Sequence, residues 1–292
     1  MSDALLDIRD LRLAFKGYSG LTEVLHGISL KVGAGEKVAL VGESGSGKSV
    51  TARIILGLLQ ELRSAKVSGS VFFDGQDLEK QPLKVRQGLR GTSMSMIFQD
   101  PTSSLNPVYP IDVQFIEVLR RGSTGIAEAD ARLRAVSLLT DVSIPEPERV
   151  LASYPFQLSG GMNQRVMIAM ALANEPSLLI ADEPGTALDV TVQAQTLHLM
   201  RDLVERRGTS VLFISHNLGV VREFADRVYV IYKGRLVEHG ETYELFHNPR
   251  HPYTKALMAA VPRITGGGIP EIDEAMDGFH DAMIDHEAGV SR

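Results

Sequence analysis

Apolar and polar residues alternate over two stretches near the start of the chain, residues 6–15 and 24–32. This alternation has the period of a half-buried β-strand. The next apolar run, 37–41, ends in glycine and predicts a buried strand, and residues 49–59 then carry isoleucine and leucine at helical spacing. The chain is therefore expected to begin with two strands, followed by a strand, a glycine-rich turn and a helix.

The second half of the chain alternates helical and strand patterns, which indicates a parallel sheet with crossover helices. The expected elements there are helix 161–174, strand 177–181, helix 192–207 and strand 209–215. Shorter strand patterns occur at 71–75, 93–98, 228–232 and 235–238, the last two flanking a hairpin at Lys233-Gly234.

Residues 100–157 differ in character, with several prolines followed by helical patterns at 113–121 and 127–140. We interpret them as a helical subdomain inserted at about 100–160. A short helical and proline-rich region follows Gly240. The residues after 266 are rich in acidic side chains and are expected to form a mobile, solvated end.

The amino-acid composition excludes several classes of site and partner. Of the 292 residues, 44% are hydrophobic and 23% charged, as in proteins that bury a full core, and the net charge of −6 gives no sign of a nucleic-acid partner. The chain has no cysteine, which excludes disulfides, thiolate metal sites and cysteine nucleophiles. No signal peptide is recognisable at the N-terminus, and no apolar run approaches the roughly 20 residues that cross a bilayer. Any work at a membrane is expected to depend on docking to other chains.

The strongest motif is Gly42-Glu43-Ser44-Gly45-Ser46-Gly47-Lys48-Ser49, which fits G-x-x-x-x-G-K-S. Its glycines allow backbone N–H groups to turn inward and, with the following helix N-terminus, to hold phosphate oxygens. Lys48 is expected to reach the β- and γ-phosphates, and the Ser49 hydroxyl to bind Mg²⁺. The predicted strand before the motif and helix after it support this interpretation over a merely flexible loop.

Two carboxylates, Asp182 and Glu183, follow the apolar strand 177–181. The carboxyl end of a parallel strand is where ligands bind in such sheets. One carboxylate could hold Mg²⁺ and the other could orient an attacking water, as phosphoryl transfer requires. On their own, two acids after a strand are more often a cap or a solvated turn, so this interpretation depends on the phosphate loop.

Ser159-Gly160-Gly161-Met162 opens the helix that begins near Gly161. Free N–H groups at such a helix start can bind an anion, although an isolated Ser-Gly-Gly is more often a plain N-cap.

Taken together, these motifs resemble those of the ATP-binding-cassette (ABC) family, in the family's order. Gly42–Ser49 is similar to a Walker A, Gln99 to the Q-loop glutamine, and Ser159–Met162 to the signature motif. Asp182-Glu183 resembles a Walker B with its catalytic glutamate, 187–189 a D-loop, and His216 a switch histidine.

The resemblance implies roles for these residues. Glu183, His216 and Gln99 would be catalytic, with Ser49, Gln99 and Asp182 at Mg²⁺. Ser159, Gly160, Gly161 and Met162 would close over ATP held by a partner subunit, and Asp189 would help to join the two sites. Phe15 stands where the family stacks an aromatic ring on adenine; Tyr18 is the alternative, and Phe15 could equally be a core residue at a strand end.

Further residues resemble the oligopeptide/dipeptide/nickel importer ATPases, namely 98–107 (FQDPTSSLNP) and 251–257 (HPYTKAL). At the last position of the signature motif, Met162 matches the residue type of the "D"-type ATPase subunit of such systems. Three features depart from that pattern. Asn163 replaces the usual arginine and is expected to alter only a surface of the signature helix, and Gly185 replaces a threonine and is expected to loosen the turn toward the D-loop. Without cysteine, the iron–sulfur cluster of many relatives cannot form.

The expected fold is an α/β, RecA-like P-loop NTPase: an ABC nucleotide-binding domain with an antiparallel β subdomain and the inserted helical subdomain. The ABC ATPase domain would span 5–240, a family-type extension 241–266 and the acidic, mobile tail 267–292.

The resemblance implies an ATP-hydrolysing importer subunit with ATP and Mg²⁺, at the cytoplasmic face of the inner membrane. Its partners would be a second, non-identical ATPase, two permease subunits and an extracytoplasmic solute-binding protein, with no nucleic acid. The alternatives are a non-transport ABC ATPase of DNA repair or translation, and a P-loop small-molecule kinase. The first lacks its expected coiled coil or tandem cassette, and the second has no use for Ser159–Met162 or His216.

Overall fold

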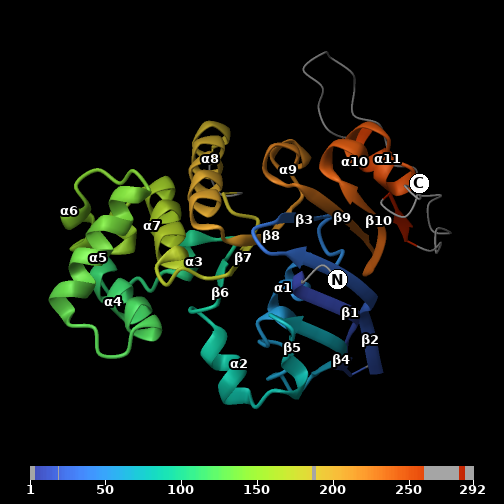
Figure 1. Cartoon of the computed structure of the whole chain (residues 1–292), viewed down its shortest axis with the longest axis horizontal. Coiled ribbons are helices and arrows are strands. Elements are labelled where there is room, and N and C mark those ends of the chain that lie inside the picture. The colour runs from blue at the N-terminus through green and yellow to red at the C-terminus, as the bar shows by residue number, and fades with distance from the viewer. Residues whose placement is uncertain (1–3, 19, 186–188, 260–282, 287–292) are drawn as a thin grey trace. The chain divides into compact units, whose positions relative to one another are not determined.

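A computed structural model of the chain describes residues 4–18, 20–185, 189–259 and 283–286. The chain divides into two compact units, residues 1–80 with 213–292 (unit 1) and residues 81–212 (unit 2). Figure 1 labels the elements in chain order. The units are described one at a time.

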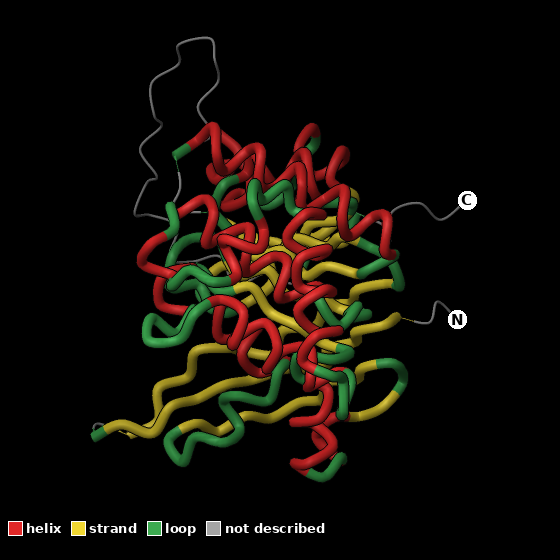
Figure 2. Tube along the Cα trace, turned by 90° about the vertical axis from the view of Figure 1, so that its left-hand side faces the viewer, coloured by secondary structure: helices red, strands yellow, loops and turns green. Residues whose placement is uncertain are grey.

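Unit 1 contains a four-stranded antiparallel sheet in the order β2-β1-β4-β5, which confirms the expected antiparallel element. Its long strands run side by side (Figure 2). Leu6, Leu11 and Leu13 are buried on β1 while Arg12 is exposed, as the alternation predicts. The strands are β1 (Ala4–Gly17), β2 (Gly20–Gly33), β4 (Ala65–Phe73) and β5 (Gln76–Asp77).

Strand β4 begins six residues before the predicted start at residue 71. Residues 65–70 are half-buried or exposed, and only Ala65 and Val67 among them are apolar, so their pattern is too short to predict a strand. Backbone pairing with β1, as at Phe15↔Ala65 and Arg12↔Ser68, holds them in the sheet instead.

Unit 1 also contains a second set of strands, in the order β11-β10-β9-β3. The last of them is β3 (Lys37–Val41). β9 (Arg227–Tyr232) is parallel to β3, and β10 (Arg235–Glu241) returns antiparallel to β9, which confirms the hairpin at Lys233-Gly234. Every residue of β3 is buried. β8 (Ser210–Ser215) carries the chain from unit 2 into unit 1.

The tail differs from the expected mobile end at residues 283–286. There β11 (Ile284–Asp285) pairs in parallel with β10, at Glu238↔Ile284 and His239↔Asp285. Asp285 and the following His286 pair with His239 and Glu238 on β10, contacts that composition alone does not reveal. Residues 267–282 and 287–292, the rest of the predicted tail, lie outside the described residues.

The helices of unit 1 are short. Helix α1 ends at Ile55 rather than at the predicted 59, because Gly57 adopts a left-handed φ of 71° and its N–H turns back to Ile54. The helices are α1 (Lys48–Ile55), the 3₁₀ turn η1 (Leu78–Lys80), α9 (Leu218–Phe224), α10 (Thr242–His247) and α11 (Pro252–Ala259).

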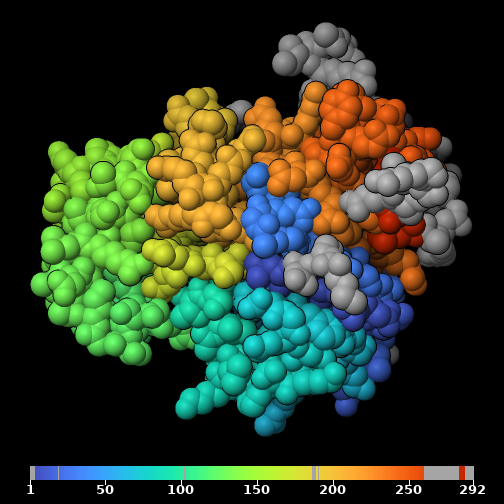
Figure 3. All heavy atoms as spheres, in the orientation of Figure 1, coloured from blue at the N-terminus to red at the C-terminus, as the bar shows by residue number. Residues whose placement is uncertain are grey.

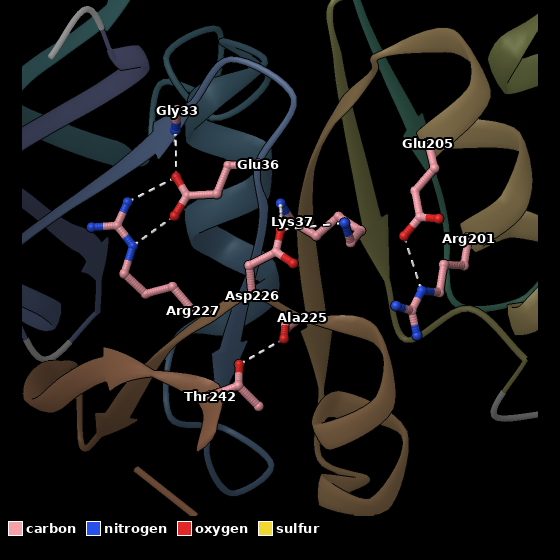
Figure 4. Close-up of polar contacts among 9 residues, drawn as sticks. All are labelled: Gly33, Glu36, Lys37, Arg201, Glu205, Ala225, Asp226, Arg227 and Thr242. Atoms are coloured by element: carbon pink, nitrogen blue, oxygen red, sulfur yellow. Dashed lines mark hydrogen bonds and ion pairs between the residues drawn. The ribbon is translucent and has the colours of Figure 1, made fainter. Parts of the chain in front are cut away.

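Charged pairs join the ends of the unit 1 strands (Figure 4). The Arg227 guanidinium meets the Glu36 carboxylate through two bonds of 2.8 Å, and Glu36 also accepts the Gly33 N–H. Lys37 lies beside Asp226 in the same region. Because the Arg227–Glu36 pair is bidentate and largely buried, it fixes the turn before β3 against the start of β9.

Unit 2 pairs β6 (Met94–Ile97) in parallel with β7 (Leu178–Asp182), confirming a parallel sheet in this half of the chain. Helix α7 (Gly160–Leu172) buries most of its side chains, and α8 (Val190–Arg207) follows β7. The remaining elements are α2 (Leu83–Leu89), α3 (Pro101–Ser104), α4 (Ile111–Gly122), α5 (Glu128–Asp141), α6 (Pro147–Leu151) and the 3₁₀ turn η2 (Pro155–Gln157).

Helices α4 to α6 form one contiguous lobe of unit 2, green in the space-filling view (Figure 3). Phe115 and Leu119 on α4 and Ala135 and Leu139 on α5 are buried between them. The predicted helical subdomain at 100–160 contains these helices, and its boundaries stay a prediction.

Candidate functional site

The phosphate loop connects β3 to α1 in unit 1. Gly42 lies so close to β9 that an added Cβ would stand 2.1 Å from the Ile231 carbonyl oxygen. Gly47 has a φ of 110°, and a Cβ there would stand 2.5 Å from the Leu25 side chain. Both positions therefore require glycine. At Gly42 a side chain would clash with β9, and at Gly47 it would clash with Leu25 and would also strain the backbone.

Lys48 is only 4% exposed. Its Nζ donates to the carbonyl oxygens of Gly42 and Glu43, at 2.8 Å each, so the ammonium lies inside the curve of the loop. An ammonium that backbone carbonyls hold inside the loop stands where it could also meet the oxygen of an anion. Ser49, half-buried, follows on the first turn of α1.

The β9–β10 hairpin supports the far side of the loop. The N–H of Gly234 donates to the Ser46 carbonyl oxygen at 3.0 Å, and the Gly234 carbonyl accepts the His26 N–H at 2.9 Å. Ser44 and Gly45 remain exposed at the tip of the loop. The loop is thus held at its base and open at its tip, as a phosphate cradle requires.

His216 comes directly after β8, whose residues are all buried, and its side chain is exposed. Asn217 caps α9 through its Oδ1, which accepts the Gly219 and Val220 N–H groups. The fold therefore presents His216 at the carboxyl end of a strand, as predicted.

The adenine-stacking prediction stays open. Phe15 is half-buried on β1, opposite Thr22 on β2 and Ala65 on β4, whereas Tyr18 is fully exposed in the turn that follows. Neither position decides between a stacking ring and a residue at a strand end.

In unit 2 the structure brings Gln99 and Glu183 together. Asp182 ends the buried strand β7 at 4% exposure, and Glu183 follows it. Gln99 lies 84 residues earlier and donates from Nε2 to the Glu183 Oε2 at 3.1 Å. The predicted Q-loop amide and catalytic carboxylate therefore form one polar pair.

Glu183 has a backbone φ of 49°, a left-handed conformation that glutamate seldom adopts. Such strain is retained where the surrounding fold overdetermines it, often at functional sites. Two residues later Gly185 has a φ of 94°, so the residue that departs from the family pattern occupies a position suited to glycine.

Ser159 is the N-cap of α7, and its Oγ accepts the Met162 N–H at 3.3 Å. Ser159 and Gly160 are exposed. A Cβ on Gly161 would stand 2.8 Å from the Val192 side chain, so this glycine lets α7 approach α8. The capping role is observed, and the role of the motif in binding a partner's nucleotide stays a prediction.

The expectation that Asn163 lies on the surface of the signature helix is wrong. Asn163 is 4% exposed, and its Nδ2 donates to the Pro155 carbonyl oxygen at 3.0 Å. It lies on the face of α7 that packs toward η2, so the asparagine ties the helix start to the turn before it.

Asp189 is exposed and caps α8, with its Oδ1 accepting the Val192 N–H at 3.0 Å. The other predicted D-loop residues, 187 and 188, lie outside the described residues.

Among the residues that the structure describes, no three histidine or acidic side chains gather into a metal-binding cluster. The predicted Mg²⁺ ligands Ser49, Gln99 and Asp182 include a single carboxylate, and their role stays a prediction. Mg²⁺ prefers such oxygen ligands and takes the rest of its shell from phosphates and water.

Sequence reasoning assigned no role to Glu238, which is fully buried on β10. Its carboxylate accepts the Arg250 and His251 N–H groups and pairs with the His286 Nε2 at 2.6 Å. Burial alone would raise the pKa of the Glu238 carboxyl, but the nearby Thr254 hydroxyl, the His286 ring and the two backbone N–H groups together outweigh it and lower that pKa. Two of these donors belong to the segment His251-Pro-Tyr-Thr254, which lies in the stretch 251–257 that resembles the importer ATPases.

We predict that the ionised Glu238 carboxylate makes the free energy of unfolding decrease as the pH falls. Its lowered pKa means that the folded state stabilises the ionised form, so this contribution is full above the ordinary carboxyl pKa and is lost as the pH falls through the folded value. Glu238→Gln should lower the free energy of unfolding at pH 7 by about 2–4 kcal/mol, measured with urea. The variant should also lose less stability than the wild type below about pH 4.5.

The matched control is Glu241→Gln, an exposed carboxylate on the same strand. It should leave the stability at neutral pH and its acid dependence nearly unchanged. Equal acid dependence in the wild type and Glu238→Gln would contradict the prediction.

The chain resembles known proteins over most of its length. The family described as ABC transporter matches residues 25–186, and that described as Oligopeptide/dipeptide transporter, C-terminal region, matches residues 237–280. The chain is 48% identical over 268 residues to the oligopeptide transport ATP-binding protein OppD of Bacillus subtilis, covering 92% of this chain and 75% of that protein.

Two further similarities extend the comparison. The chain is 51% identical to the peptidoglycan transport ATP-binding protein YejF of Agrobacterium fabrum, covering 89% of this chain and 47% of that protein, so it spans about half of that relative. Among solved structures, the dimeric ATP-binding cassette MJ0796 bound to ADP and Pi matches with a TM-score of 0.72 and 27% identity, over 81% of this chain and 98% of that one.

Proposed function

Since the chain belongs to the ABC transporter family, we propose that it is the ATP-binding and ATP-hydrolysing subunit of an importer of peptides or similar small solutes. The observation that carries the catalytic part is the hydrogen bond from Gln99 to Glu183. This bond holds the proposed water-activating carboxylate against Gln99, which stands two residues before α3.

In the proposed reaction, backbone N–H groups of the phosphate loop and the Lys48 ammonium bind the β- and γ-phosphates. Glu183 accepts a hydrogen bond from a water whose oxygen attacks the γ-phosphorus, as the bond to the β,γ-bridging oxygen breaks to give ADP and phosphate. Lys48 and His216 stabilise the negative charge of the γ-phosphoryl group. Mg²⁺, bound by Ser49, Gln99 and Asp182, would neutralise charge on the phosphate oxygens.

A second ATPase subunit, a non-identical paralogue, would complete the site. The exposed Ser159 and Gly160 at the start of α7 support this proposal, because they offer backbone N–H groups that a partner's nucleotide could meet. Asp189 is likewise exposed beside α8. Nucleotide held between two subunits provides the differential affinity that an ATP-driven closure needs.

Relatives named for oligopeptide and dipeptide transport, together with the matched C-terminal region, support peptides as the solute class. They also favour the importer over an ABC ATPase of DNA repair or translation. None of the helices that the structure describes is long and apolar enough to cross a bilayer. From the relatives named as transport ATP-binding proteins, we propose two permease subunits and an extracytoplasmic solute-binding protein as partners, with this chain peripheral on the cytoplasmic face of the inner membrane.

The proposal predicts that an affinity-tagged full chain, purified from detergent-solubilised membranes of its own cells, carries two permeases and a second ATPase with it. A parallel purification from the same cells with a tag on an unrelated protein serves as the control. Recovery of the chain only from the membrane-free fraction, without permeases, would argue for a non-transport ATPase.

A further inference from the structure

The C-terminal extension contacts the phosphate loop through one tyrosine. Tyr253, on the first turn of α11, is 1% exposed, and its hydroxyl oxygen accepts the backbone N–H of Glu43 at 3.0 Å. Its ring packs on that of Tyr232, with centroids 4.3 Å apart. The two partners of this hydrogen bond lie 210 residues apart.

The turn before α11 is itself held in place. The Tyr253 N–H donates to His251 Nδ1 at 3.1 Å, and the His251 N–H donates to the buried Glu238 carboxylate. Because Arg250 also donates its N–H to that carboxylate, one charged group fixes two successive peptides just before Tyr253. The hydroxyl therefore projects from a rigid support.

The contact acts on Glu43, a residue that also helps to position Lys48. The Glu43 N–H bonds to Tyr253, while the Glu43 carbonyl accepts the Lys48 Nζ at 2.8 Å. Fixing that peptide therefore fixes one of the two acceptors that hold the ammonium. Burial raises the pKa of the Tyr253 phenol, so it stays neutral and puts no negative charge beside the phosphates.

We propose that Tyr253 is a positioning residue of the phosphate loop, through which the C-terminal extension sets the affinity for nucleotide phosphates. The hydroxyl holds the start of the loop, and the Gly234 N–H holds Ser46 on its other side. A loop held at both points loses less conformational freedom when it closes on phosphate. The proposal rests on the nucleotide binding proposed above and adds a role for the extension.

The test compares Tyr253→Phe, which removes only the hydroxyl, with the wild type. We expect MgATP binding by calorimetry to weaken about two- to tenfold, the net value of one hydrogen bond. The turnover number at saturating ATP should change little, since Tyr253 does not touch the reacting atoms. In the nucleotide-free protein, hydrogen exchange across residues 42–49 should become faster.

Tyr243→Phe is the matched control, because Tyr243 lies on α10 of the same extension with a ring that is 71% exposed. It should match the wild type in affinity and loop exchange. Unchanged affinity in Tyr253→Phe, or an equal loss in both variants, would overturn the proposal.

A measurement on the wild type alone provides an independent test. The backbone amide hydrogen of Glu43 should exchange slowly with solvent in the folded protein. If it exchanges as fast as in an open loop, the proposal is overturned, even if Tyr253→Phe does not fold. If the wild type fails to bind MgATP, the proposed function fails, while slow exchange of the Glu43 amide would still report the contact.

Discussion

Glu183→Gln is expected to abolish most steady-state ATP hydrolysis, by about 100-fold or more, while leaving ATP binding intact. The substitution keeps the length and shape of the side chain but replaces the carboxylate that would polarise the attacking water. Gln99 can still donate to the remaining carbonyl oxygen, as it does to the Glu183 Oε2. Phosphate release should be measured alongside binding of MgATP by calorimetry.

Glu175→Gln is the matched control for this experiment. Glu175 is also in unit 2, precedes β7 and has a left-handed φ of 52°, so the same change meets a similar backbone. Its side chain is exposed and pairs only loosely with Arg134, at 3.4 Å. The control should hydrolyse ATP at the wild-type rate, and unchanged hydrolysis in Glu183→Gln would remove Glu183 from its assigned role.

Lys48→Ala is expected to weaken nucleotide binding itself, by about 10- to 100-fold, which is the value of a hydrogen bond to a charged group. Lys48 is buried in the loop, where its Nζ meets the Gly42 and Glu43 carbonyls. Removing it deletes the only lysine charge of the loop and takes one donor from each of those carbonyls. Isothermal titration with MgATP measures the effect.

Lys31→Ala is its control, since Lys31 is an exposed lysine on β2 of the same unit. MgATP binding by Lys31→Ala should be unchanged. The control thus distinguishes the loss of Lys48 from the loss of any one positive charge on the protein. Circular dichroism of both variants checks that the fold persists. Wild-type affinity in a folded Lys48→Ala protein would show that the loop does not bind phosphate through this residue.

The sequence by itself determined the local part of this protein. The order of strands and helices, the hairpin at Lys233-Gly234 and the glycines of the phosphate loop follow from short-range patterns and backbone sterics. The exposed His216 after β8 and the carboxylates after β7 were also predictable, because the end of a buried strand places the next residues at the sheet edge.

Only the tertiary structure decided which distant residues meet. Gln99 and Glu183 are 84 residues apart, and Tyr253 and Glu43 are 210, so no spacing rule brings either pair together. Packing likewise placed Asn163 inside, where its amide binds the Pro155 carbonyl, although a polar residue next to an exposed cap predicts a surface position. Residues 65–70 of β4 and the whole of β11 are strands because they pair with β1 and β10, not because of a strong strand pattern of their own. Apart from the Asn163–Pro155 contact, which joins residues eight apart, these contacts are long-range, and long-range contacts depend on the whole fold.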